Sequence, residues 1–357
     1  MSGSKKSDLA NAETPLILNA WYVAGTSDEI GESLLDRWLL GRSILLYRTS
    51  DGRPVAVDNR CPHRSFPLSQ GQRDGDNVVC GYHGMTFDPE GRCTRIPALA
   101  KTPSNIRTQT YPVVERAPLV WFWPGDPALA DAALIPSHLA LNDPSWAPTS
   151  GYFHIAANYV GLQENLQDLS HFEHLHSSSI GVPDQSVAAT DVEIGTDTIR
   201  STRVYCNVLA PELWKNVLPL KGERITRTIA EAFHSPALCE AQTTITDEAG
   251  NGLENPNYHV RILHFITPKF QHETHYWWFF LRDFMTDDEE VGRSFAKGIA
   301  GAFAEDKEAL ESISSLVRAD KRGSFQELSF ASDKAGVLIR RQLKQFADLE
   351  ANETIGR

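Results

Sequence analysis

The 357-residue sequence contains no run of eighteen apolar residues, so we expect no membrane-spanning helix and no membrane partner. The first six residues hold no apolar stretch of the kind that directs secretion, which predicts a cytoplasmic protein. Cysteine is scarce, and its number, five, is odd. A disulfide framework is therefore not expected.

Positive charge is also in short supply. The chain has 34 Lys and Arg against 46 Asp and Glu, a net charge of −12, which argues against nucleic-acid binding. The deficit is uneven, because residues 15–124 hold twelve basic and eleven acidic side chains. An acidic protein partner is therefore expected to approach this third with less repulsion than the rest of the chain.

Two of the cysteines stand in matched pairs with histidines, as Cys61-Pro62-His63 and Cys80-Gly81-Tyr82-His83. Thiolate and imidazole ligands favour zinc or iron over magnesium or calcium. Structural zinc sites usually pair Cys with Cys and His with His, whereas each pair here supplies one sulfur and one nitrogen. The pattern predicts a Rieske [2Fe-2S] cluster with Cys61 and Cys80 on one iron and His63 and His83 on the other. The alternative is a zinc knuckle, or four residues with no common role.

The length predicts two domains of an α+β protein. Residues 1–14 are polar and are expected to be disordered. Short apolar runs separated by turns predict an N-terminal Rieske β-sandwich over 15–124, with the cluster loops at one end. A Pro-rich connector opens the segment 125–357, where strands over 198–208, 224–233, 238–246, 258–266 and 275–281 precede helices over 287–317 and 333–349. We expect a helix-grip catalytic domain, with a helix packed on a curved antiparallel sheet.

A second group of metal-binding residue types lies early in this domain. Asn165, Asp168, His171, His174 and His176 fall within twelve residues, on a segment with a helical pattern. On an ideal helix Asp168 and His171 share a face, while His171 and His176 lie about 140° apart. Both histidines reach one ion only if the helix distorts or ends between them. His174 competes as a ligand, and a polar surface face without metal is the other interpretation.

The predicted late helix supplies a carboxylate. A non-heme iron(II) site uses two His and one carboxylate. Asp306 falls on the apolar stripe formed by Ile299, Phe303, Leu310 and Ile313. A buried carboxylate needs a partner, which a metal, an arginine or a loop end can provide. Glu305 lies off the stripe and is expected to be solvated.

With both motifs in hand, the chain resembles the Rieske non-heme iron oxygenases, and within them the vanillate and dicamba O-demethylase group. The resemblance runs from Asn19–Ala24 through the two Cys/His loops, residues 165–171 and 303–306, to Ala335-Gly336-Val337 and Arg340-Arg341. It implies that His171, His176 and Asp306 bind the mononuclear iron and that Asn165 lies near it without being a full ligand. It also implies that Asp168 bridges the cluster of one protomer to the iron of its neighbour in a homotrimer, because head-to-tail contacts that close form a ring.

The same resemblance implies an enzyme, the oxygenase component of a monooxygenase. Electrons from NAD(P)H are expected to arrive through a separate ferredoxin or flavin reductase, and O2 is activated at Fe(II). The expected reaction is O-demethylation of a methoxylated aromatic acid with release of formaldehyde. A ring-hydroxylating dioxygenase giving a cis-diol, an N-demethylase and a pure Rieske electron carrier are the alternatives. Chain length favours the demethylase over the dioxygenase, and the long segment after Pro124 exceeds what a carrier needs.

For the substrate pocket the sequence indicates individual candidate residues but no motif. Trp214 and the strand 275–280 supply aromatic surface, and Trp278 lies on one face of that strand with Tyr276 and Phe280. Asn207 and His264 are polar groups suited to binding a carboxylate or a phenol oxygen. The predicted pocket residues are Asn207, Trp214, His264 and Trp278. Around residues 214–227 the sequence departs from the vanillate enzyme, so the aromatic acid stays open.

Overall fold

The chain folds into two compact units. The computed structural model describes residues 8–177, 179–181, 183, 189–195, 198–250, 257–322 and 327–355. The N-terminal unit comprises Leu18–Ile135 and Thr267–Phe270, and the C-terminal unit comprises the rest of the chain. No helix in the described residues is long and apolar enough to cross a membrane.

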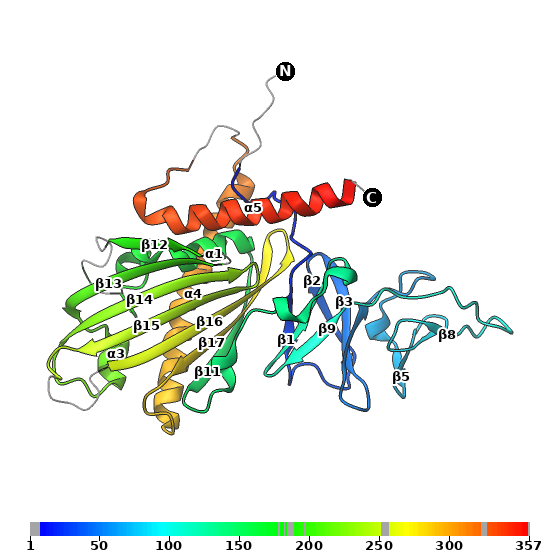
Figure 1. Cartoon of the computed structure of the whole chain (residues 1–357). Coiled ribbons are helices and arrows are strands. Elements are labelled where there is room, and N and C mark those ends of the chain that lie inside the picture. The colour runs from blue at the N-terminus through cyan, green and yellow to red at the C-terminus, as the bar shows by residue number, and fades with distance from the viewer. Residues whose placement is uncertain are drawn as a thin grey trace, which may run out of the picture. The chain divides into compact units, whose positions relative to one another are not determined.

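The N-terminal unit is built from three small antiparallel sheets, drawn mainly in blue and cyan in Figure 1. The first sheet has the order β1 (Tyr22–Thr26), β10 (Leu119–Phe122), β9 (Val113–Arg116). The second is β2 (Leu35–Leu39), β3 (Arg42–Arg48), β4 (Pro54–Asp58). The third is β5 (Gln72–Asp74), β6 (Asn77–Val79), β7 (Thr86–Phe87), β8 (Cys93–Arg95). The short helices are η1 (Leu68–Gln70), η2 (Pro127–Leu129) and η3 (Ala132–Leu134).

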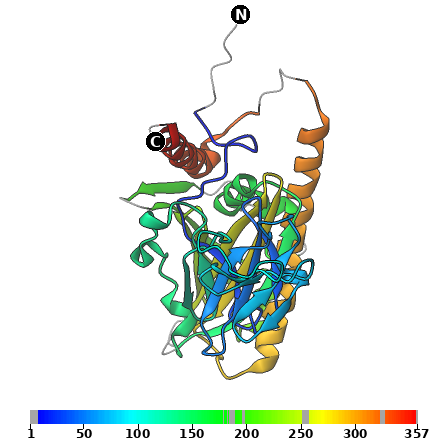
Figure 2. The same cartoon turned by 90° about the vertical axis from the view of Figure 1, so that its right-hand side faces the viewer.

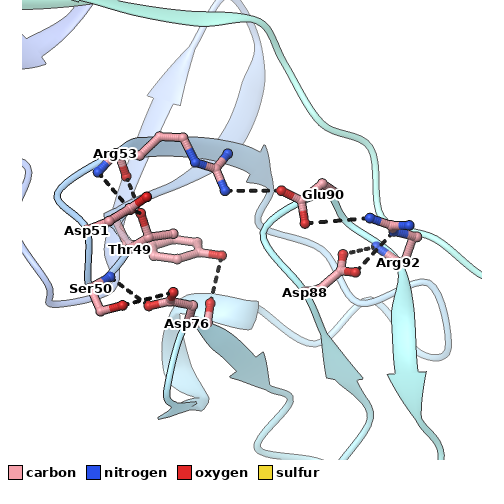
Figure 3. Close-up of polar contacts among 9 residues, drawn as sticks. Thr49, Ser50, Asp51, Arg53, Asp76, Asp88, Glu90 and Arg92 are labelled. Carbon is pink, nitrogen blue, oxygen red and sulfur yellow. Dashed lines mark hydrogen bonds and ion pairs between the residues drawn. The ribbon is translucent and has the colours of Figure 1, made fainter.

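Polar contacts join the turns of this unit (Figure 3). The backbone N–H of Ser50, in the β3–β4 turn, donates to Asp76 between β5 and β6 at 2.7 Å. Arg53 pairs with Glu90 in the β7–β8 turn at 3.0 Å, and Glu90 lies 3.8 Å from Arg92. Exposed ion pairs contribute little to stability. We therefore infer that the main role of these contacts is to position the turns relative to one another.

The C-terminal unit is a seven-stranded antiparallel sheet with a long helix against it (Figures 1 and 2). Its strand order is β11 (Ala147–Ile155), β17 (Glu273–Arg282), β16 (Asn257–Phe270), β15 (Leu238–Asp247), β14 (Arg224–Ser235), β13 (Ile199–Leu209), β12 (Thr190–Ile194). Its helices are η4 (Leu139–Asn142), α1 (Tyr159–Gln167), η5 (Leu169–His171), α2 (Phe172–Leu175), α3 (Glu212–Val217), α4 (Glu289–Ala319), η6 (Ala331–Asp333) and α5 (Lys334–Ile355). The expected α+β arrangement of a helix on a sheet is confirmed.

Helix α4 carries the predicted stripe. Asp288 caps its first turn by accepting from the backbone N–H of Glu290 and Val291. Ile299, Phe303, Asp306 and Leu310 are buried. Ile313 was expected on the same buried stripe, but it is 55% exposed. Because Leu316 and Val317 are exposed as well, the buried part of the stripe ends at Leu310.

The ends of the two units differ from the expected boundaries. Residues 1–7 of the predicted disordered segment lie outside the described residues, but Ala10 is buried. Its N–H donates to the carbonyl oxygen of Arg340, whose Nε donates to the carbonyl oxygen of Ala10, each at 2.9 Å. The N-terminal unit extends to 135 rather than 124. The first part of the Pro-rich connector packs with this unit, since Trp21 Nε1 donates to the carbonyl of Asp131 at 2.8 Å.

Candidate metal centres and substrate cavity

The two Cys/His loops of the N-terminal unit have the same backbone geometry. In the first loop, Cys61 N donates to the carbonyl of Phe66 and Ser65 N donates to the carbonyl of Cys61, each at 2.9 Å. In the second loop, Cys80 bonds in the same way to Met85 and Gly84, at 2.8 and 3.0 Å. The fourth residue after each cysteine has a left-handed conformation, with φ 59° at Ser65 and 69° at Gly84. The loops therefore present their side chains as a matched pair.

The four side chains of these loops suit an iron–sulfur cluster. Cys61 and Cys80 are buried and free, and the rings of His63 and His83 are exposed, with centroids 4.5 Å apart. Burial raises the pKa of the Cys61 thiol, the backbone N–H of His63 opposes this effect, and the Cys80 thiol raises the pKa further. Two adjacent buried thiols and two imidazoles are the donors of a Rieske cluster, and bound iron would stabilise both thiolates.

In the C-terminal unit, the predicted helix of the second metal site is interrupted. Helix α1 ends at Gln167, Asp168 has an extended conformation, and the chain then forms η5 and α2. Asp168 caps the new segment by accepting from Ser170 N and Ser170 Oγ at 2.9 and 2.8 Å. His176 follows the last turn, with φ −101° and ψ 23°. This break meets the condition that the sequence set for His171 and His176 to reach one ion.

His171, His176 and Asp306 converge. The Nε2 atoms of the two histidines lie 3.2 Å apart, and Asp306 Oδ1 lies 3.4 Å from that of His171 and 3.2 Å from that of His176. Ligands about 2.1 Å from one ion and roughly at right angles lie about 3 Å apart, so the three donors fit one face of a metal ion. Burial alone would raise the pKa of Asp306, but the two imidazoles hold it well below its usual range. His174 is exposed and lies outside this group.

Two neighbours orient these ligands. Glu305 Oε2 lies 2.7 Å from His176 Nδ1 and accepts from Ser179 Oγ at 3.0 Å. The expectation that Glu305 is solvated was wrong, because its position beside the stripe brings the carboxylate to the Nδ1 edge of the His176 ring. Asn165 Nδ2 donates to Asp306 Oδ1 at 3.0 Å. Asn165 Oδ1 is buried and has no hydrogen-bond partner in the described part of the chain, so it faces the site with unused acceptor capacity.

A cavity of about 50 Å³ lies beside the three donors, between helix α4 and the sheet. Trp214 and His264 line it, as predicted, and so does Phe280. Burial lowers the pKa of His264 to about 3, so its ring is neutral, and its Nδ1 lies 2.6 Å from Tyr276 Oη. The small free volume means that side chains must move to admit an aromatic ring.

Two predicted pocket residues do not line this cavity. Asn207 is exposed with φ 53°, because the pairing of β13 with β14 is irregular between Tyr205 and Val208 and turns it outward. Trp278 is buried against Phe303, with ring centroids 5.5 Å apart, and belongs to the core. Sequence reasoning missed Arg227 and Glu231, which line the cavity from β14. Their signal was their alternation with Ile225, Ile229 and Phe233 along one strand face.

Both halves of the chain match known families. Residues 20–112 match the Rieske [2Fe-2S] domain, and residues 155–349 match the vanillate O-demethylase oxygenase C-terminal domain. The chain is thus a Rieske-type non-heme iron oxygenase. More narrowly, it belongs to the vanillate O-demethylase oxygenase family.

Individual relatives cover almost the whole chain. The toluene-4-sulfonate monooxygenase system iron-sulfur subunit of Comamonas testosteroni is 36% identical over 83% of this chain and 87% of its own. A vanillate O-demethylase oxygenase subunit of Pseudomonas sp. is 33% identical over 93% and 95%. Dicamba monooxygenase bound to 3,6-dichlorosalicylic acid has a TM-score of 0.89 at 29% identity and covers 94% of this chain and 99% of its own. The protein is therefore an enzyme that uses a Rieske [2Fe-2S] cluster, mononuclear non-heme iron and O2.

Proposed function

We propose that the protein is the oxygenase component of a monooxygenase that O-demethylates a methoxylated aromatic acid. The main observation in support of this proposal is the convergence of His171, His176 and Asp306 beside a cavity that is lined mainly by apolar and aromatic side chains. One atom of O2 enters a C–H bond of the methoxy methyl group, and the other leaves as water after two electrons and two protons are supplied. The resulting hemiacetal breaks down to formaldehyde and a phenol.

The residues of the C-terminal unit have separate roles in this proposal. His171, His176 and Asp306 hold the iron, which supplies the site of O2 activation when bound. Glu305 fixes the ring of His176, and Asn165 fixes the carboxylate of Asp306. We assign the proton of Tyr276 Oη to the bond with His264 Nδ1, which leaves the Nε2 proton of His264 to donate to a substrate oxygen.

Electron delivery involves other chains. We infer that a ferredoxin or flavin reductase passes electrons from NAD(P)H to the cluster held by Cys61, His63, Cys80 and His83, in the cytoplasm. Asp168, at the start of η5, would then link the cluster of one protomer to the iron of its neighbour in a trimer. Its side chain is 27% exposed, so an imidazole of another subunit can reach it.

A second candidate is hydroxylation of an aryl methyl group. It is favoured by the 36% identity with the toluene-4-sulfonate system. The same residues would hold iron and orient the ring, because the metal centre does not specify the bond attacked. A benzylic alcohol would then be the product, with the second oxygen atom of O2 released as water, and no formaldehyde would form.

The first test is iron and acid-labile sulfide per chain, with an EPR spectrum of the reduced protein. We expect about three irons and about two sulfides, with a Rieske signal. Asp306→Ala should lose one iron and keep the cluster signal. A screen of methoxylated aromatic acids with a surrogate reductase should then release formaldehyde. A fully reconstituted wild type with two irons would overturn the mononuclear site, and a cis-diol product would overturn O-demethylation.

A further inference from the structure

An arginine lies in the substrate cavity, and no ion pair within 4.0 Å joins it to an acidic side chain in the described part of the chain. Arg227, on β14, is 4% exposed and lines the cavity together with the three metal-site donors. Burial lowers the pKa of its guanidinium to about 10, so it stays charged near neutral pH. Removing a charge from water costs several kcal/mol unless an opposite charge or hydrogen bonds compensate.

The contacts of Arg227 compensate only part of this cost. Its Nη1 donates to the carbonyl of Ile180 at 3.3 Å, and its Cζ lies 5.7 Å from the ring centroids of both Phe172 and Trp214. Nε is enclosed and has no hydrogen-bond partner among the residues the structure describes. The indole N–H of Trp214 is likewise unpartnered within that part of the chain. The cavity thus holds a charged donor and a neutral donor that remain available.

Glu231 does not form a short-range ion pair with Arg227. It shares the inward face of β14 with Arg227, but no ion pair within 4.0 Å joins the two described side chains. Burial raises the pKa of the Glu231 carboxyl group well above its ordinary value, and the charge of Arg227 only partly opposes this effect. Its Oε2 also has no hydrogen-bond partner in the described residues. The positive charge of Arg227 is therefore left to be matched by a ligand.

We propose that Arg227 binds the anionic group of the aromatic substrate, a carboxylate or a sulfonate, and thereby selects aryl anions. A guanidinium fork matches the oxygens of either group, and a charge-assisted bond in a cavity closed to water is strong. The inference rests on the proposed function for the metal site, and it adds the residue that recognises the acid.

The position of Arg227 also orients the substrate. The ring of Phe172 contacts those of His171 and His176, with centroids 5.1 and 5.3 Å apart, and Arg227 Cζ lies 5.7 Å from the Phe172 ring centroid. Arg227 is thus about one aromatic ring away from the metal-binding histidines. An anionic group held there places a substituent elsewhere on the substrate ring beside the iron.

The test is calorimetric binding of unreactive ligands to the iron-loaded, cluster-loaded enzyme without O2 or reductant. The probes are benzoate, benzenesulfonate and neutral benzamide, and the two anions distinguish a carboxylate site from a sulfonate site. We expect wild type to bind at least one anion about tenfold or more tightly than benzamide. Arg227→Met should weaken anion binding about thirtyfold or more and abolish that preference, whereas Arg227→Lys should keep part of it.

Arg282→Met is the matched control. Arg282 is also a buried arginine with an unpartnered Nε in the described structure, but its Nη2 donates to the carbonyls of Met285 and Asp288 away from the cavity. Its variant should keep the wild-type preference for anions.

Two results would overturn the proposal. They are equal binding of benzoate, benzenesulfonate and benzamide by wild type, or an unchanged preference for anions in a folded Arg227→Met. The wild-type comparison decides the question even if the Arg227 variant does not fold. Because these experiments involve no turnover, failure of O-demethylation would appear separately, as anion binding without formaldehyde release.

Discussion

At the scale of single residues, the contact between Glu305 and His176 predicts a defect confined to the iron site. Loss of a carboxylate that orients a metal-bound histidine typically lowers metal affinity by about 10- to 100-fold. We therefore expect Glu305→Ala to weaken Fe(II) binding by about that factor and to leave the Rieske EPR signal intact. Anaerobic titration of the iron-depleted protein with Fe(II) measures this change in affinity.

The control for this variant lies on the same helix. Glu308 is exposed on α4, so Glu308→Ala should bind Fe(II) as wild type does. Equal affinities for the Glu305 and Glu308 variants would show that Glu305 does not support the site.

The residue scale also shows what helical and strand periodicity can predict. The stripe on α4 identified Asp306, because burial follows the helical repeat. It could not place Glu305, since a residue beside a stripe either enters solvent or bends over a neighbour on another element. Asn207 was misplaced because a local irregularity of β13 breaks the alternation of faces. Arg227 was overlooked because charged residues are seldom fully buried.

At the scale of elements, the matched cluster loops predict different sensitivities for two glycines. Gly84 has φ 69°, and a Cβ there would lie 3.0 Å from Pro97 Cγ. Gly84→Ala should therefore destabilise the N-terminal unit by about 1–2 kcal/mol. At Gly31 a Cβ would meet no atom within 4 Å and φ is not positive, so Gly31→Ala should change stability little. The stability of each variant can be measured in urea by following the loss of the visible circular dichroism signal of the cluster.

Equal urea midpoints for the two alanine variants would contradict the strain assigned to the second loop.

The geometry of the two cluster loops could be predicted only in part from the sequence. Gly84 indicated a turn, but Ser65, at the equivalent place in the first loop, gave no sign of its φ of 59°. The strands and long helices were predictable within a few residues, because apolar runs and caps determine them locally. The break after α1 could not be predicted from the sequence, which showed only that some break was needed for His171 and His176 to reach one ion.

At the scale of the whole molecule, the domain boundary shows the limit of composition. Prolines mark where regular structure stops, but Asp131 and Ala132, at the start of η3, accept hydrogen bonds from Trp21 and Arg116 of the N-terminal unit. Those contacts are made over a long sequence distance, so no local pattern could reveal them. The same holds for Ala10 and Arg340, which join the two ends of the chain.

The proposed trimer makes a prediction about mixed assemblies. If electrons cross from the cluster of one protomer to the iron of the next, a Cys80→Ser chain and an Asp306→Ala chain are each inactive alone but complement each other. In a ring of randomly mixed chains, an interface is productive when its donor keeps the cluster and its acceptor keeps the iron. Equal coexpression should thus restore about a quarter of the wild-type formaldehyde release per chain.

Two controls make the complementation specific. Each variant must show the expected metal content, with the cluster intact in Asp306→Ala and iron bound in Cys80→Ser. The separately purified variants, mixed without subunit exchange, should remain inactive. If coexpressed chains sediment as mixed trimers but release no formaldehyde, electrons do not cross between subunits. The bridging role of Asp168 would then fail, while the metal sites within each chain would stand.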